Sequence, residues 1–287
     1  MARNAVVSGA STGIGRAIAL HLDTLGFRVF AGVRRDEDGA ALQAEATERL
    51  VPLHLDVTDE AGVAAAAKSV AVAVGAEGVQ GVVNNAGVGG GGIGEFIDLD
   101  GLRQLFEVNV FGVATMTREF LPLVRQGGGR VVHIGSMGGY TASPFIAPYS
   151  ATKHAIEALA DGLRRELRPW DIHVALIEPG AVATPIWEKG RSETERLLSS
   201  LPDRGRELYG PLIETFSAYL DGSEARGVPP ERVAEAVAHA LTAARPRTRY
   251  RVGPDARITW WLAKLLPDRV MDALLARKLG LPRRVDS

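Results

Sequence analysis

The chain has 287 residues, of which 46% are hydrophobic and 23% are charged, so we expect one folded α/β domain over residues 1–287. It contains no cysteine, which excludes disulfide frameworks and thiolate metal sites and is compatible with a reducing cytoplasm. The six histidines lack metal-binding spacing, and a net charge of −1 gives no general attraction to nucleic acid. We therefore expect neither a metal ligand nor a nucleic-acid partner.

The sequence shows no pattern for secretion or for crossing a membrane. Its first residues run directly into an apolar segment, without the basic start and cleavage site of a signal peptide. No apolar run reaches the roughly eighteen residues that a spanning helix needs. We expect a cytoplasmic protein that is soluble or peripheral to a membrane.

Short β-branched runs alternate with longer Ala- and Leu-rich helical patterns along the chain. This alternation indicates βαβ units around a parallel sheet, and about seven strands predict a doubly wound sheet of the Rossmann type. The expected strands are residues 4–8, 28–33, 51–55, 81–84, 130–134, 173–177 and 250–252. The expected helices include residues 15–25, 61–74, 102–124 and 151–167.

Three glycines, Gly9, Gly13 and Gly15, lie where the first strand passes into the first helix. Backbone amides and the helix dipole can hold a pyrophosphate there, and a Cβ would obstruct the turn or the phosphates. The spacing differs from G-x-G-x-x-G, and a glycine-rich turn without a ligand is the alternative interpretation. The second strand, which follows the first helix closely, favours a dinucleotide site.

Tyr149 is followed four residues later by Lys153, which places a phenol and an ammonium on one face of a helix. A phenol titrates near about pH 10, and a nearby positive charge lowers that pKa, so Tyr149 could exchange a proton near neutral pH. Ser136 follows the fifth strand, at the edge of the sheet where ligands bind. The alternative is a surface Tyr–Lys pair, which the joint occurrence of these motifs disfavours.

Together these motifs resemble those of the short-chain dehydrogenase/reductase family, in its compact single-domain branch. The likeness rests on the segments Ser8-Gly9-Ala10-Ser11-Thr12-Gly13-Ile14-Gly15, Asn84-Asn85-Ala86-Gly87 and Tyr149-Ser150-Ala151-Thr152-Lys153, with Asn109, Ser136 and Pro179-Gly180. It covers about residues 4–184 and continues weakly to residue 252. Ser8 stands where the family commonly has Thr, and both side chains carry a hydroxyl.

The resemblance implies four catalytic residues. Tyr149 would be the general acid in reduction and the general base in oxidation, and Ser136 would hold the substrate oxygen. Lys153 would bind the cofactor ribose, and Asn109 would anchor a water in a proton relay. For Asn109 the alternative is a buried amide that satisfies backbone groups within a helix bend.

The end of the second strand bears on the choice of cofactor. An acidic residue there selects the 2'-hydroxyl of NAD, whereas an arginine accommodates the 2'-phosphate of NADP. Val33 occupies the acidic position and Arg34 follows it, so NADP(H) is favoured over NAD(H), unless the acids at 36–38 pair with the arginines. The expected cofactor-binding residues are Gly9, Ser11, Thr12, Gly13, Ile14, Gly15, Arg34, Asp56, Val57, Asn85, Ala86, Gly87, Tyr149, Lys153, Pro179, Gly180, Val182 and Thr184.

These features predict an NADP(H)-dependent oxidoreductase that transfers a hydride between nicotinamide and a secondary alcohol and its ketone, or an aldehyde. An insertion at residues 188–230 is expected to form a helical substrate lid. In the size of this insertion and in having Arg34, the chain is similar to steroid and retinol dehydrogenase-like members of the family. A bulky apolar substrate is therefore favoured. The alternatives are an isomerase, dehydratase or epimerase on the same fold, and a non-catalytic dinucleotide-sensing protein. The resemblance also implies a homo-oligomer.

The last segment, residues 254–287, predicts a C-terminal helical extension with two short amphipathic helices on either side of Pro267. From residue 245 onward the sequence contains eleven Lys or Arg and four Asp, although the whole chain has a net charge of −1. Such basic amphipathic helices can lie on an anionic membrane surface. We expect instead that their apolar stripes pack over the substrate pocket or a partner subunit.

Overall fold

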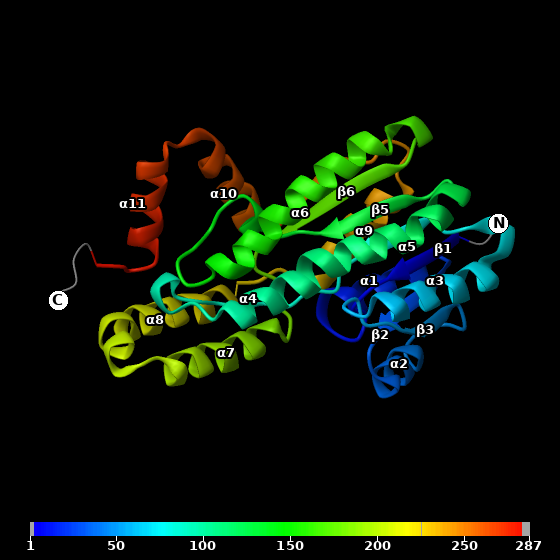
Figure 1. The fold of residues 1–287 in the computed structure, drawn as a ribbon. Coiled ribbons are helices and arrows are strands. Elements are labelled where there is room, and N and C mark those ends of the chain that lie inside the picture. The colour runs from blue at the N-terminus through cyan, green and yellow to red at the C-terminus, as the bar shows by residue number, and fades with distance from the viewer. Residues whose placement is uncertain (1–2, 225, 283–287) are drawn as a thin grey trace.

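The fold is a seven-stranded, wholly parallel sheet with the order β3-β2-β1-β4-β5-β6-β7, as shown by a computed structural model that describes residues 3–224 and 226–282 (Figure 1). The strands are β1 (Arg3–Val7), β2 (Phe27–Val33), β3 (Leu50–His54), β4 (Gly81–Asn84), β5 (Arg130–Ile134), β6 (His173–Pro179) and β7 (Arg249–Val252). The order reverses between β1 and β4. This confirms the predicted doubly wound sheet, in which ligands bind beyond the carboxyl ends of the strands at the reversal.

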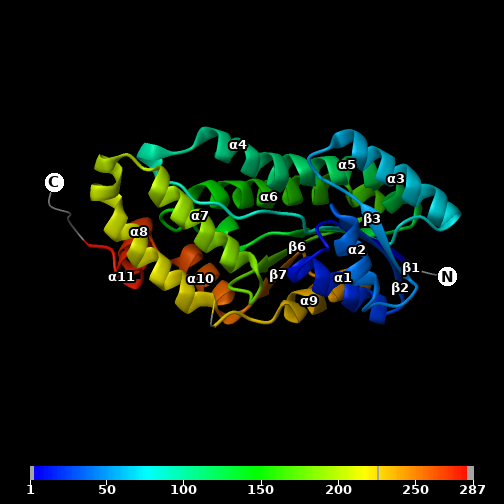
Figure 2. The ribbon, with the colours of Figure 1, turned by 90° about the horizontal axis from the view of Figure 1, so that it is seen from below.

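Helices cover both faces of the sheet, as Figure 2 shows edge-on. One face carries α1 (Gly13–Thr24) and α9 (Pro230–Thr242), which pack against each other over a buried apolar cluster. The other carries α3 (Glu60–Val74), α5 (Gly112–Gln126) and α6 (Ala147–Glu166) over a second cluster. Burial on both faces explains why the central strands are almost continuously apolar. The short helix α2 (Asp36–Gln43) follows β2.

The helix expected at residues 102–124 is interrupted in the structure. It consists of α4 (Leu99–Phe106), a π-helical turn η3 (Glu107–Phe111) and α5. A π-turn inserts an extra residue and turns a side chain out of its helical register, which a three- and four-residue apolar spacing does not reveal. The remaining short turns are the 3-10 segments η1 (Gly75–Glu77), η2 (Gly94–Phe96), η4 (Met137–Gly139) and η5 (Arg168–Trp170).

Two helices, α7 (Ile186–Ser200) and α8 (Asp203–Glu224), account for most of the region at residues 188–230 expected to form a lid, and α7 begins two residues before it. A bridge between Val182 and Val228 closes the base of this excursion. Leu201 and Ile213 are buried with Ile93 in a third apolar cluster, separate from the two clusters against the sheet, and Phe216 is also buried. These side chains therefore pack the lid helices onto the rest of the molecule.

The C-terminal segment forms α10 (Pro254–Leu265) and α11 (Asp268–Lys278), which lie at the same end of the molecule as α7 and α8 (Figures 1 and 2). The two predicted helices are present, but Ile258, Trp261 and Leu265 are exposed. These side chains therefore do not pack over the pocket of their own chain, and their packing against a partner subunit stays a prediction. Among the described residues, no helix is both long and apolar enough to span a membrane.

Candidate active site

The carboxyl ends of β1, β4, β5 and β6 are neighbours in the sheet and bring the predicted site residues to one edge. The glycine turn follows β1, Asn85 to Gly87 follow β4, Ser136 follows β5, and the Pro179–Thr184 loop begins at the end of β6. Helix α6 adds Tyr149 and Lys153 from its first two turns. Segments that lie more than one hundred residues apart in sequence thus form one site.

The glycine turn has the close approaches that the sequence predicts. Gly9 and Gly13 adopt left-handed backbone angles, with φ of 65° and 55°. A Cβ on Gly9 would lie 2.8 Å from Ala86 Cα, and one on Gly15 would overlap the Gly9 carbonyl. Only glycine fits these positions. The turn therefore brings backbone amides to the N-terminus of α1, an arrangement suited to a pyrophosphate.

Two polar side chains hold this turn against the segment after β4. The Ser8 hydroxyl accepts hydrogen bonds from the backbone N–H groups of Asn85 and Ala86, both at 3.0 Å. The Asn85 amide nitrogen in turn donates to the carbonyls of Ser8 and Gly9, at 2.9 and 3.0 Å. The Asn85 side chain therefore holds the glycine turn in place. The hydroxyl of Ser8 is required as the acceptor for two backbone N–H groups.

Ser136, Tyr149 and Lys153 lie together at the sheet edge. Ser136 and Tyr149 are partly exposed and share a side-chain hydrogen bond, whereas Lys153 is buried. The Lys153 ammonium donates to the Ile134 carbonyl at 3.0 Å and lies 5.7 Å from the centre of the Tyr149 ring. Two hydroxyl groups are thus accessible to a ligand, with a fixed amine behind them.

Burial dominates the titration of this cluster. It raises the pKa of Tyr149, and the hydrogen bond with Ser136 acts in the opposite direction without reversing the shift. Burial also lowers the pKa of Lys153 to about 8. The predicted lowering of the Tyr149 pKa by Lys153 is therefore wrong for the chain alone. The phenol is protonated at neutral pH, the form that can donate a proton to a ligand.

Asn109 lies in the π-turn with its side chain buried. Its Oδ1 accepts from the Val88 N–H at 2.8 Å, and its Nδ2 donates to the Val88 carbonyl at 2.9 Å and to Thr152 Oγ1 at 3.1 Å. A Cβ on Gly87 would lie 3.3 Å from Asn109 Oδ1 and 3.8 Å from Lys153 Nζ. Asn109 therefore joins the π-turn to the backbone of Val88, in the loop after β4, while lying close to Lys153, and its role in a proton relay stays a prediction.

The two arginines after β2 have different surroundings. Arg35 forms two hydrogen bonds with Asp38, at 2.9 and 2.8 Å. Arg34 is exposed, and no carboxylate in residues 3–224 or 226–282 lies within ion-pair distance of it. Burial alone would raise the pKa of Asp56, but hydrogen bonds from Thr58 and the charge of Arg34 lower it. The acids after β2 thus leave the Arg34 guanidinium available.

The remaining predicted cofactor residues follow β3 and β6. The Val57 side chain is buried in the core against Gly112, so it offers only its backbone to a ligand. Val182 is buried, and the Thr184 side chain lies next to Gly13 of the glycine turn. The loop after β6 therefore contacts the glycine turn through Thr184.

One residue at this loop was missed by the sequence analysis. Asp255, in the first turn of α10, accepts a hydrogen bond from the Ala181 N–H at 2.7 Å. A Cβ on Gly180 would overlap its carboxylate, so glycine is required there. The Tyr140 hydroxyl, four residues after Ser136, donates to the Ala256 carbonyl at 2.7 Å. The start of α10 is thus bonded to both loops that flank the site.

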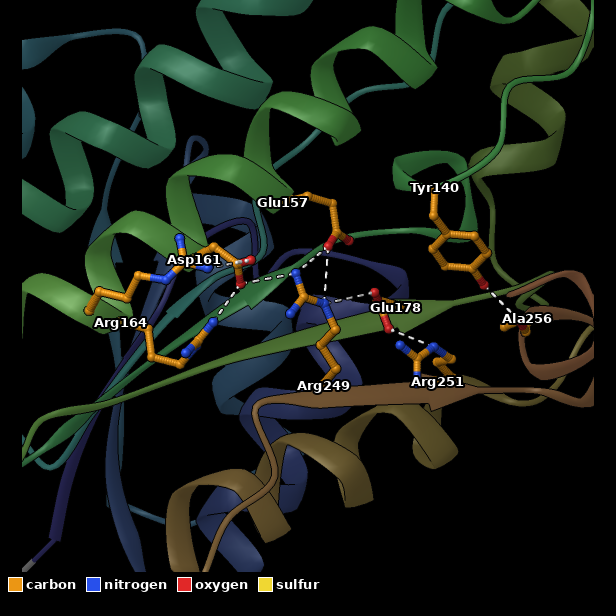
Figure 3. Close-up of polar contacts among 9 residues, drawn as sticks. Tyr140, Glu157, Asp161, Arg164, Glu178, Arg249, Arg251 and Ala256 are labelled. Atoms are coloured by element: carbon orange, nitrogen blue, oxygen red, sulfur yellow. Dashed lines mark hydrogen bonds and ion pairs between the residues drawn. The ribbon is translucent and has the colours of Figure 1, made fainter. Parts of the chain in front are cut away.

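Figure 3 shows a cluster of charges beside this contact, between α6, β6 and β7. The Arg249 guanidinium contacts Glu157 at 2.8 Å, Asp161 at 3.0 Å and Glu178 at 3.5 Å, and Arg251 lies 3.3 Å from Glu178. Burial and the Glu157 carboxylate raise the pKa of Glu178 to about 7, against the charge of Arg251. Glu157 lies one turn beyond Lys153 on the same helix, so this network fixes α6 to the edge strand β7.

The glycine turn and the cluster of Ser136, Tyr149 and Lys153 meet at one edge of the sheet, as the resemblance to nicotinamide-dependent oxidoreductases implies. A family model described as short chain dehydrogenase matches residues 3–195. The chain is 35% identical over 282 residues to the NADPH-dependent 3-dehydrocapnine reductase of Ornithobacterium rhinotracheale, covering 96% of this chain and 97% of that protein. It is 37% identical over 282 residues to retinol dehydrogenase 5 of Mus musculus, covering 96% and 88%.

Among solved structures, a short chain dehydrogenase/reductase from Burkholderia phymatum in complex with NAD matches with a TM-score of 0.77 at 27% identity, covering 99% of this chain and 98% of that one. The chain belongs to the short-chain dehydrogenase/reductase family. It is an enzyme that acts on hydroxyl or carbonyl groups with a nicotinamide cofactor. The glycine turn fits that cofactor, because the lack of a Cβ at Gly9 and Gly15 lets the turn pack tightly against Ala86 and the Gly9 carbonyl and present its backbone amides at the N-terminus of α1.

Proposed function

We propose that this enzyme uses NADP(H) to interconvert a bulky apolar secondary alcohol and its ketone, or an alcohol and its aldehyde. The observation that carries the proposal is the pair of accessible hydroxyl groups on Ser136 and Tyr149, backed by the buried Lys153. A non-catalytic dinucleotide sensor on the same fold has no comparable need for a protonated phenol beside a second hydroxyl.

In the proposed reaction the nicotinamide supplies or accepts the hydride. Ser136 donates a hydrogen bond to the carbonyl oxygen, which stabilises the negative charge that develops there. Tyr149, protonated because burial raises its pKa, transfers its proton to that oxygen as the alcohol forms. Lys153, held by the Ile134 carbonyl, is placed to bind the cofactor ribose and to keep positive charge near the phenol.

The preference for NADP(H) rests on Arg34. Its guanidinium extends from the end of β2 without an ion-pair partner among the described residues, and Val33 supplies no carboxylate to bind a ribose hydroxyl. A relative at 35% identity is named NADPH-dependent, whereas a structural neighbour holds NAD. The family thus accommodates both cofactors, and the arginine favours NADP(H) in this chain.

A bulky apolar substrate is supported by the lid and by one relative. Phe145, with a left-handed φ of 66°, lies four residues before Tyr149 and places its ring 5.6 Å from the Phe216 ring of α8. Aromatic and aliphatic side chains thus stand between the lid and the catalytic helix. The relative at 37% identity is named retinol dehydrogenase 5, and retinol is a bulky apolar alcohol. A cytoplasmic location and a homo-oligomeric assembly complete the proposal, supported by the absence of cysteine and by family membership.

The test is turnover of NADPH and NADH against a panel of apolar and polar ketones and aldehydes, followed by the ultraviolet absorbance of the reduced nicotinamide. We expect faster turnover with NADPH and with apolar carbonyl compounds. Equal affinity for the two reduced cofactors would contradict the role of Arg34, and activity restricted to small polar carbonyl compounds would contradict the substrate class.

A further inference from the structure

Helix α10 presents an apolar stripe to solvent. Ile258, Trp261, Leu262 and Leu265 recur at three- and four-residue spacing, so they share one face of the helix. Their exposed fractions are 59%, 56%, 36% and 72%. Large exposed apolar side chains that occur singly are ordinary, but four on one face form a patch that needs an explanation.

Helix α11 extends this patch and adds charge. Val270 and Leu274 lie one turn apart and are 44% and 43% exposed. The two helices contain five Lys or Arg and three Asp. One of these acids, Asp255, accepts a hydrogen bond from the Ala181 N–H. Arg257 and Lys264 each lie next to a member of the α10 stripe and are exposed. The patch is therefore apolar at its centre and basic at its borders.

The patch is held rigidly at one end of the molecule. The start of α10 is bonded to the loops that flank the active site, through Asp255 and through the Tyr140–Ala256 contact. The end of α11 packs on α8, where Lys278 Nζ lies 5.4 Å from the centre of the Tyr219 ring. Figures 1 and 2 place α11 beside α8, and α10 at the same end of the molecule, where the strands terminate. The patch thus adjoins the lid.

We propose that the α10–α11 patch, made of Ile258, Trp261, Leu262, Leu265, Val270 and Leu274, binds the surface of an anionic lipid bilayer. Apolar side chains with a tryptophan enter the boundary between headgroups and acyl chains, while the bordering Lys and Arg side chains contact anionic headgroups. The charge argues against a second copy of the chain, because a two-fold contact would bring two basic borders together. The proposal is independent of the reaction that the enzyme catalyses.

The experiment measures co-sedimentation of the full-length protein with vesicles made of equal parts phosphatidylcholine and phosphatidylserine, and with vesicles of phosphatidylcholine alone. We expect binding to the anionic vesicles that weakens several-fold between about 0.1 M and about 1 M salt, because the Debye length shortens over that range. The double variant Ile258→Ser with Leu265→Ser should bind about tenfold more weakly, since two exposed apolar side chains no longer enter the lipid.

The matched control replaces two exposed apolar residues elsewhere, Val72→Ser on α3 with Leu99→Ser on α4, which are 86% and 55% exposed in the wild type. This control should bind vesicles like the wild type. Lys264→Gln with Arg269→Gln should weaken binding and reduce its dependence on salt. Thermal melting of each variant checks that it is folded, which we expect because none of the substituted side chains is buried.

Three results would overturn the proposal. The first is a wild-type protein that does not sediment with anionic vesicles. The second is equal loss of binding in the control and in the patch variant. The third is sedimentation equilibrium in which the wild type is a dimer that Ile258→Ser with Leu265→Ser converts to a monomer, which would assign the patch to contact between copies of the chain.

Discussion

The edge of the sheet and the C-terminal helical end are built in contrasting ways. At the sheet edge, Ser8, Asn85, Asn109 and Lys153 are all held by hydrogen bonds to backbone groups, beside strands whose side chains are buried. In α11, all of which the structure describes, no residue is buried, and in α10 only Ala256 is. The predicted site residues therefore lie on a rigid scaffold, whereas α10 and α11 bury few residues against the rest of the chain.

The two regions meet at a few polar contacts. Asp255 binds the loop after β6, and the Ala256 carbonyl accepts a hydrogen bond from Tyr140, four residues after Ser136. A change at the C-terminal helices can reach the cofactor loop only through such contacts. The comparison thus predicts large effects from substitutions at the sheet edge and smaller effects from substitutions at the junction.

The largest effect is expected at the phenol. Tyr149→Phe should lower turnover by about a thousandfold, because the proton donor is lost, while the ring still packs against Gly138. NADPH affinity should change by less than about twofold, as measured by fluorescence titration. Tyr250→Phe, which removes a hydroxyl bonded to the Arg247 N–H, serves as control and should retain full turnover. If Tyr149→Phe keeps more than about a tenth of the wild-type rate, the assignment of the phenol as proton donor is wrong.

The buried lysine should give a pH dependence of stability. Burial lowers the Lys153 pKa from 10.5 to about 8, so the unfolded chain binds this proton more tightly than the folded chain. The destabilisation is fully present below about pH 8 and is relieved as the pH rises toward 10.5. The difference in unfolding free energy between Lys153→Met and the wild type should change by about 3 kcal/mol over that window. Chemical denaturation of both proteins measures it, and a constant difference would show that Lys153 titrates normally.

Cofactor choice should depend on one of two adjacent arginines. Arg34→Ala should weaken NADPH binding about tenfold to a hundredfold and leave NADH binding unchanged, because it removes charged hydrogen bonds to the 2'-phosphate. Arg35→Ala is the matched control, since Arg35 is engaged by Asp38. Titration with both cofactors measures the effect. If both variants lose NADPH affinity equally, the guanidinium acts through general charge and not as a phosphate ligand.

The smallest effect is expected at the junction. Asp255→Ala should raise the KM for the cofactor about fivefold with little change in kcat, because the loop after β6 loses the acceptor for its Ala181 N–H. Asp255→Asn, which keeps an acceptor oxygen, should recover part of the loss. Asp268→Ala, at an exposed acid in the first turn of α11, is the control. Steady-state kinetics with varied NADPH would disprove the coupling if Asp255→Ala matched that control.

The sheet and the catalytic cluster could be predicted because each depends on short sequence patterns. Alternating apolar runs identify the strands, and Gly9, Gly13 and Gly15 stand where the backbone excludes a side chain. The role of Asp255 could not be predicted, because its partner Ala181 lies 74 residues earlier and an acid in the first turn of a helix is commonplace.

The exposed stripe of α10 shows a second limit. Apolar periodicity at Ile258, Trp261 and Leu265 indicates that a face needs a cover, but it does not say whether that cover is the same chain. The π-turn was missed for a related reason. Asn109 is placed there by bonds to Val88, a contact that no local pattern contains.

Transfer of an isotopic label tests the central claim most directly. NADPH that carries deuterium at the transferable position of the nicotinamide ring is supplied with an apolar ketone that the enzyme accepts, and the product is analysed by mass spectrometry. The account predicts an alcohol with deuterium on the former carbonyl carbon, formed by the wild type and not by Tyr149→Phe. Conversion of the substrate without incorporation of deuterium and without net oxidation of NADPH would contradict it, and would assign the site to isomerisation or dehydration.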